Sequence, residues 1–156
     1  MIRRLLVFLL LFTPGYLAIG QGTKVTLPFN PTGTYRLANE TYVRHGDTYG
    51  YTGTIRVKLI KPDRIAVSLY ICKGAPSYNL GSFVDTLVFR NHRAVYHHAE
   101  DDTSCRITFR FTSKGVTVGQ VQADLDSGCD FGHAVFADGY YKKVSGKVPV
   151  IRDEDE

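Results

Sequence analysis

The sequence predicts an all-β protein, an antiparallel meander of about eight strands that closes into a barrel, with a β-sandwich as the alternative. Three observations predict this class. Apolar and polar residues alternate in one segment after another, and Gly, Pro, Asn and Asp separate those segments. Tyrosine and phenylalanine are frequent, at 10 and 9 residues, which favours strands. No segment has a convincing amphipathic helical period. The barrel is preferred because closure removes exposed sheet edges and consecutive hairpins need no long crossover.

The strands are expected to follow one another with short connections. In the segment that ends at Ile60, Ile55 and Val57 share one face, and Arg56 and Lys58 share the other. The same alternation, bounded by turn residues, recurs along the rest of the chain. Strands are expected at 34–37, 49–60, 65–71, 82–90, 94–99, 105–112, 116–121 and 133–144, with a long loop at 123–132.

Residues 1–20 have the pattern of a secretory signal peptide. Arg3 and Arg4 precede the apolar run Leu5–Phe12, a Pro-Gly pair follows, and small residues end the segment. A buried N-terminal helix is the alternative interpretation. The apolar run is too short for a transmembrane helix, which needs roughly 20 apolar residues. The sequence therefore predicts a secreted or periplasmic protein.

The rest of the chain is expected to be one β-barrel domain at 21–151, followed by an acidic tail at 152–156. The whole sequence has 19 basic and 15 acidic residues, for a net charge of +4. Basic and acidic residues are interleaved along the domain, so no basic stripe is arranged to follow a nucleic-acid backbone. We therefore expect no nucleic-acid partner, and no transmembrane segment once 1–20 is removed.

Three cysteines agree with export into an oxidising compartment, where one pair is expected to close and one thiol to remain. Cys105 opens a clear strand and Cys129 lies in a Gly- and Asp-rich loop that can adapt to disulfide geometry. We expect these two to pair. Cys72 ends an alternating strand and is expected to be a small buried apolar residue. No cysteine or histidine spacing indicates a zinc site.

The loop after residue 122 holds Asp124, Asp126 and Asp130, and carboxylates at this spacing can converge on calcium. The loop departs from the known calcium-loop spacing and has no closing Glu. The alternative is that these side chains accept hydrogen bonds from nearby backbone amides in turns. We predict no metal and no cofactor.

Asp85 is the unusual residue of its strand, because it shares the predicted core face with Phe83 and Leu87. A carboxylate there needs a partner or must stay protonated. The facing strand can supply His97 or His98, and an Asp–His pair is suited to general base chemistry in a hydrolase. A structural pair, or a solvent-facing Asp85, is the alternative. No recognisable motif places a nucleophile nearby, so we predict no catalytic residues and no enzyme.

Two stretches resemble a group of exported bacterial proteins of similar length whose activity is uncharacterised. The first has G-A-P-S-Y-N at 74–79, and the second has C-x-F-G-H-x-V-x-A-D-G-x-Y at 129–141. The group has Gly where this chain has Asp130. The second stretch is also similar to the tail of periplasmic lysozyme-inhibitor proteins. Gly33–Tyr35 resembles the start of lipocalin-like barrels. These resemblances imply a lipocalin-like or lysozyme-inhibitor-like barrel.

The favoured function is a non-catalytic binding module with a protein or glycan partner at the cell envelope, for which lysozyme is one candidate. Loops on a rigid β scaffold commonly bind partners. The candidate binding residues are Ser77, Tyr78 and Asn79 in one loop, and Phe131 and His133 in another, held near Cys105 by the disulfide. Local turn structure is the alternative role for both loops. The alternative function is a carrier of a small apolar ligand in the barrel interior.

Overall fold

The computed structural model describes residues 29–98, 105–123 and 128–152. The predicted signal peptide, together with Asp124 and Asp126 of the acidic loop, lies outside these residues. Nine strands and one short 3-10 helix are formed within the described part of the chain. They are β1 Gly33–Leu37, β2 Tyr42–Arg44, β3 Asp47–Lys61, β4 Arg64–Gly74, β5 Leu80–Val88, β6 Arg93–Tyr96, β7 Cys105–Phe111, β8 Gly115–Gln122, the helix Gly128–Asp130, and β9 Gly139–Ser145.

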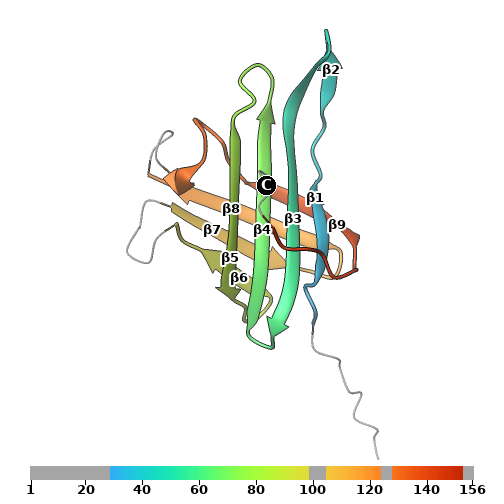
Figure 1. The fold of residues 1–156 in the computed structure, drawn as a ribbon, viewed down its shortest axis with the longest axis vertical. Helices are drawn as coiled ribbons and strands as arrows, with labels where there is room; N and C mark the ends of the chain where they lie inside the picture. The colour runs from blue at the N-terminus through green and yellow to red at the C-terminus, as the bar shows by residue number, and fades with distance from the viewer. Residues whose placement is uncertain (1–28, 99–104, 124–127, 153–156) are drawn as a thin grey trace, which may run out of the picture.

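The strands form one antiparallel sheet that curls into a nearly closed barrel, which confirms the predicted fold class. The sheet order is β5-β4-β3-β1-β9-β8-β7-β6, with β2 added beside β3. Apart from β2, and from β5 and β6 at the two ends of the order, strands that follow one another along the chain are neighbours in the sheet. β1 joins the two halves by pairing with both β3 and β9. Figure 1 shows β3, β4 and β5 running crosswise to β7, β8 and β9, so the barrel is flattened into two layers.

The last strand begins later than the sequence predicts, at Gly139 rather than at residue 133. The segment just before this strand is held by hydrogen bonds to side chains instead of a main-chain ladder. Gln120 on β8 accepts a hydrogen bond from the amide of Ala137 at 2.8 Å and donates to the carbonyl of Val135 at 3.3 Å. Asp138 accepts from the amide of Gln120 at 3.0 Å. These contacts satisfy the buried polar groups of an irregular segment that alternation alone cannot distinguish from a strand.

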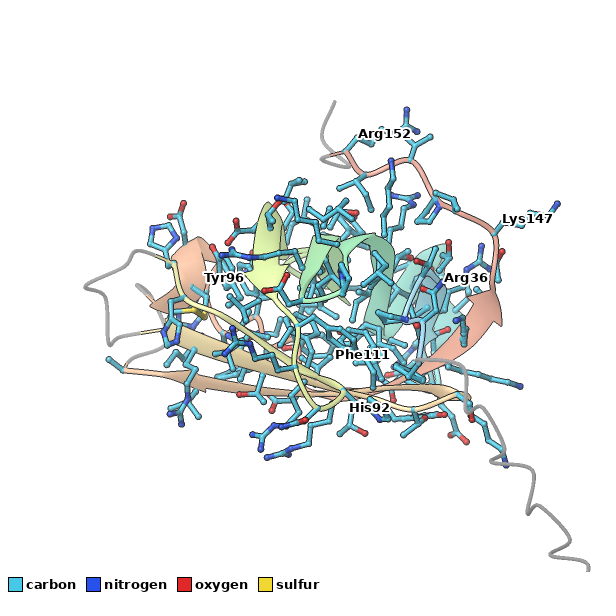
Figure 2. The ribbon with its side chains drawn as sticks, turned by 90° about the horizontal axis from the view of Figure 1, so that it is seen from below. Arg36, His92, Tyr96, Phe111, Lys147 and Arg152 are labelled. Atoms are coloured by element: carbon cyan, nitrogen blue, oxygen red, sulfur yellow. A yellow bond between two sulfur atoms is a disulfide. The ribbon has the colours of Figure 1, made fainter. Side chains whose placement is uncertain are left out.

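The interior of the barrel is packed with aromatic rings (Figure 2). Phe109 lies 6.2 Å from Phe111 in a stacked arrangement, and Phe111 meets the edges of Tyr35 and Phe89 at 6.0 and 5.7 Å between ring centroids. Phe83 meets Phe109 at 6.4 Å, also edge to face. Offset and edge-to-face pairs add to the area that each ring buries. The rings therefore form one continuous cluster across both layers.

The same cluster closes the barrel where the sheet does not. β5 and β6 lie at the two ends of the sheet order, so no β-ladder joins them. Phe83 on β5 stacks on Tyr96 on β6, with ring centroids 3.8 Å apart and planes 8° from parallel. Both side chains are buried, at 7% exposed each. A side-chain pair thus spans the gap between β5 and β6.

Phe83→Ala is predicted to destabilise the fold by about 3 kcal/mol, because it removes the ring that spans this gap and leaves a cavity beside Phe109. Val84→Ala on the same strand is the control, since Val84 is 45% exposed. The measurement is the free energy of unfolding in urea for each variant. Equal losses in the two variants would contradict the closing role of the Phe83 ring.

Two buried tyrosines carry hydroxyl groups inside the barrel. The hydroxyl of Tyr35 donates to the carbonyl of Pro31, and the hydroxyl of Tyr141 donates to the carbonyl of Ala137 at 3.0 Å. Burial raises the pKa of Tyr35 from 10.0 to about 12, and burial together with the charge of Asp138 raises the pKa of Tyr141 above its usual range. Both phenols therefore keep their protons in the folded state.

The raised pKa values predict alkaline unfolding. Because the folded state holds these protons more tightly, stability is complete below pH 10.0 and falls as pH rises from there toward about 12. The last part of the rise in tyrosinate absorbance should coincide with loss of the β-sheet signal in circular dichroism, because Tyr35 ionises as the barrel opens. Tyr35→Phe should extend the stable range to higher pH. Tyrosinate absorbance that saturates while the β-sheet signal is intact would contradict this prediction.

Cys105 and Cys129 form the predicted disulfide, with an S–S distance of 1.98 Å and a Cα–Cα distance of 4.8 Å. The bond ties the start of β7 to the short helix across a separation of 24 residues. Both sulfurs are buried. Cys72 is half-buried and free, and its sulfur accepts a hydrogen bond from the amide of Gly74. A disulfide is compatible with an oxidising compartment.

Removing the disulfide by Cys105→Ala with Cys129→Ala should cost about 3 kcal/mol, since the loop it closes regains entropy in the unfolded chain. The readout is the urea midpoint under non-reducing conditions, with Cys72→Ala as the control that leaves the loop closed. Thiol titration of the denatured native chain should find one reactive sulfhydryl. Three reactive sulfhydryls would refute the disulfide.

Candidate functional site

One end of the barrel is extended by the β2–β3 hairpin, which reaches beyond the neighbouring strands beside the β4–β5 loop (Figure 1). The pairing of β3 with β4 is irregular between Tyr49 and Thr52, and Gly50 lies in that bulge with a φ of +96°. A Cβ on Gly50 would lie 2.8 Å from the carbonyl oxygen of Glu40. Glycine therefore allows the chain before β2 to pass close to the bulge.

Three tyrosines gather on this end, and we call Tyr42, Tyr49 and Tyr78 the tyrosine platform. Tyr42 and Tyr49 stack face to face, with centroids 5.1 Å apart and planes within 5°. Tyr42 is 62% exposed and Tyr78 is 42% exposed. Beside them, Val43 is 70% exposed. Large aromatic side chains that remain exposed on a paired hairpin are typical of partner-binding surfaces.

A hydrogen-bond network holds Tyr78 against the hairpin. Its hydroxyl donates to the carboxylate of Asp47 at 2.8 Å and accepts from the amide of Thr48 at 3.2 Å. The hydrogen bond to Asp47 raises the pKa of Tyr78 above its usual value. The β4–β5 loop is thereby joined to the start of β3, and the ring of Tyr78 is held in place in solvent.

The structure brings the two predicted binding loops together. The side-chain amide of Asn79 donates to the carbonyl of His133 at 2.9 Å, and the amide of Gly132 donates to the carbonyl of Leu80 at 2.8 Å. Ser77 and His133 are exposed, whereas Asn79 is half-buried. Asn79 therefore joins the loops.

Phe131 lies inside the barrel, at 5% exposed, and not on the surface patch that the sequence analysis predicts. Its ring lies against Gly81, where an added Cβ would come within 2.4 Å of the ring. The missing side chain at Gly81 is what makes room for the ring. Of the two binding residues predicted in this loop, His133 is consequently the one that is exposed.

Sequence reasoning missed Tyr42, Val43 and Tyr49 as members of the site. All three residues of β2 are exposed, so the alternation that reveals a half-buried strand is absent there. The sequence nevertheless carries a signal in Gly46, because glycine favours tight turns. In the structure His45 and Gly46 form the hairpin turn with positive φ, at 51° and 88°. Two aromatic residues on either side of such a turn indicate a projecting hairpin.

Asp85 is exposed, in agreement with the solvent-facing alternative and not with a place in the core. It lies on β5, a strand at one end of the sheet order, and its carboxylate accepts a hydrogen bond from the amide of Thr86 at 2.6 Å. His97 lines the same groove as Asp85, and His98 is exposed nearby. Asp85 and His97 thus line one surface groove, on opposite sides of the gap between β5 and β6.

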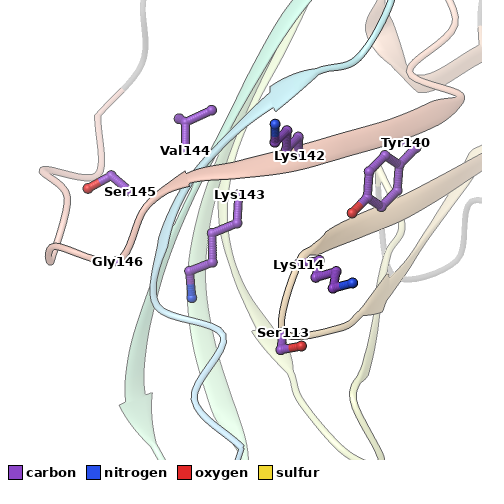
Figure 3. Close-up of a pocket in the computed structure, with 8 residues that line it drawn as sticks. All are labelled: Ser113, Lys114, Tyr140, Lys142, Lys143, Val144, Ser145 and Gly146. Carbon is purple, nitrogen blue, oxygen red and sulfur yellow. The ribbon is translucent and has the colours of Figure 1, made fainter.

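A second hollow, of about 460 Å³, lies between the β7–β8 turn and the end of β9 (Figure 3). Lys143 extends from β9 along this hollow, and its Nζ is 5.5 Å from the centre of the Tyr35 ring. Burial lowers the pKa of Lys143. A Cβ on Gly33, whose φ is +152°, would lie 2.7 Å from Cε of Lys143. Glycine at 33 thus lets Lys143 cover the ring of Tyr35 at this end of the barrel.

Among the described residues, no three histidine, cysteine, aspartate or glutamate side chains gather closely enough to hold a metal ion. Nor does that part of the chain contain a helix with the length and apolar character needed to cross a membrane. No family model, curated protein or solved structure matches the chain.

Proposed function

We propose that this protein is a non-catalytic binding module, secreted or periplasmic, whose tyrosine platform docks a protein or glycan partner at the cell envelope. The observation that carries the proposal is the stack of the exposed Tyr42 on the half-buried Tyr49, with Tyr78 held beside it by Asp47. Tyrosine buries a large area on contact, loses little conformational entropy, and keeps a hydroxyl for hydrogen bonding. Both protein surfaces and sugar rings suit such a platform.

The rigidity of the platform supports docking without rearrangement. Tyr78 is fixed through Asp47 and Thr48, and the loop that carries it is fixed through Asn79 and His133. A preorganised surface avoids part of the entropy cost of ordering loops on binding. Lysozyme is the first partner to test, because the resemblance to lysozyme inhibitors in the second cysteine stretch points to it. Peptidoglycan fragments are the glycan counterpart.

The packed interior supports this function over the alternative of an apolar carrier. Phe83, Tyr96, Phe109 and Phe111 occupy the middle of the barrel and contact one another. A ligand in a barrel of this size needs space that those rings already fill. The surface of the barrel, and not its interior, is therefore where we place recognition.

Tyr78→Ala is predicted to weaken partner binding about thirtyfold, since central aromatic residues dominate interface energies. The matched control is Tyr140→Ala, because Tyr140 is 41% exposed and belongs to β9, away from the platform. Binding is measured by calorimetry with lysozyme and, separately, with soluble peptidoglycan fragments. Tyr78→Phe should have an intermediate effect, because it keeps the ring and loses the bond to Asp47.

Nuclear magnetic resonance titration of the native chain identifies the surface directly. Amide shifts should concentrate at 42–49 and 76–79 with whichever partner binds. Shifts confined to other strands, or equal losses of affinity in the Tyr78→Ala and Tyr140→Ala variants, would contradict the platform as the binding surface. The absence of binding to both probes at high micromolar concentration would remove lysozyme and peptidoglycan as partners.

A further inference from the structure

The barrel has a second surface with the features of a recognition site, in the gap between β5 and β6. Arg90 and Arg93 exchange both main-chain hydrogen bonds, at 3.0 and 2.9 Å, around a two-residue turn in which Asn91 and His92 have positive φ. This turn has the form of a tight hairpin turn. Beyond that one pair, no ladder joins the two strands, and they diverge from the turn (Figure 1). A groove of about 480 Å³ lies in the opening.

The walls of the groove are two strand edges. Among the strands that the structure describes, β5 pairs only with β4 and β6 pairs only with β7. In an antiparallel strand, alternate residues direct their main-chain N–H and C=O groups to opposite sides. Each strand therefore directs part of its backbone hydrogen-bonding groups toward the groove. A strand edge of this kind is a template for an extended peptide.

The charge of the groove is strongly positive. Arg64, Arg90 and Arg93 line it, and Asp85 is the one carboxylate among its lining residues. That carboxylate already accepts the amide of Thr86. Arg93 also lies directly opposite Arg110 on β7. Like charges at facing positions repel, so a bound anion would relieve a repulsion built into the sheet. Guanidinium groups bind carboxylates through two parallel hydrogen bonds.

The groove also offers apolar contacts, which favour a peptide over a highly charged polymer. Leu87 and Ala94 lie at its base, at 4% and 2% exposed. Val88 and Val95 lie on its two sides, at 44% and 37% exposed. Alternating side chains of an extended peptide can place aliphatic groups against these residues and carboxylates against the arginines.

We propose that the groove between β5 and β6 binds an extended acidic segment of a partner protein, in which main-chain groups pair with a strand edge and carboxylates pair with Arg64 and Arg93. The groove shares no residue with the tyrosine platform. This second site is therefore independent of the function proposed for that platform.

The test uses the native chain and a fluorescein-labelled peptide of about eight residues that alternates glutamate and valine. Fluorescence anisotropy measures its affinity. A lysine–valine peptide should not bind. A glutamate–valine peptide with N-methylated backbone amides should bind about tenfold more weakly, because it cannot donate to the strand edge. Arg93→Gln should also weaken binding about tenfold, through loss of a bidentate contact.

Arg36→Gln is the matched control, because Arg36 is an exposed strand arginine that does not line the groove. It should leave the affinity unchanged. Equal weakening by Arg36→Gln, or equal binding of the lysine peptide, would overturn the proposal. Unchanged binding of the N-methylated peptide, with displacement by inorganic phosphate at millimolar concentration, would show a simple anion site and would also overturn it. A platform variant, Tyr78→Ala, should bind the peptide normally, which separates the two sites.

Discussion

The stack of Phe83 on Tyr96 is the contact on which the closed shape of the barrel depends. Every other neighbouring pair of strands in the sheet order is joined by a ladder of main-chain hydrogen bonds, whereas β5 and β6 share only the pair at their turn. Two rings 3.8 Å apart take the place of that ladder on the inside. Phe109 and Phe111 continue the contact along β7, the strand that pairs with β6. Side-chain packing in the core, and not a main-chain ladder, therefore closes the barrel between β5 and β6.

The strands were predictable from the sequence because one face of each is buried. Ile65, Val67, Leu69 and Ile71 alternate along β4, and all four are at most 1% exposed. The disulfide was predictable on other grounds, because Cys105 begins a strand and Cys129 lies in a loop that can adapt to disulfide geometry. Alternation failed in two places. β2 is exposed throughout and shows no alternation, whereas the segment before β9 buries Val135 and Ala137 at alternate positions without forming a strand.

The candidate site was predictable in part, and the missing part is tertiary. Tyr78 stood out as an aromatic residue in a polar loop, but its partner Asp47 lies 31 residues away in the chain. Tyr42 and Tyr49 become neighbours only through the register of β2 with β3. Phe131 was misplaced because its burial depends on the missing side chain of Gly81. Asp85 is exposed, which is the solvent-facing alternative that the sequence left open, and alternation alone could not decide between the two.

The turn at Asn91 and His92 has a consequence for the order in which the parts of the barrel fold. This hairpin has one reciprocal pair of main-chain hydrogen bonds, between Arg90 and Arg93. It cannot grow into a ladder from the turn, because β5 and β6 form no further pair. The two halves of the barrel, β1 to β5 and β6 to β9, can therefore acquire their ladders separately and meet through side chains afterwards. β1 joins the halves by the ladder that it forms with β9, and isolated main-chain bonds, such as that from Gly132 to Leu80, add to it. Assembly of this wall thus resembles the docking of two sheets more than the growth of one.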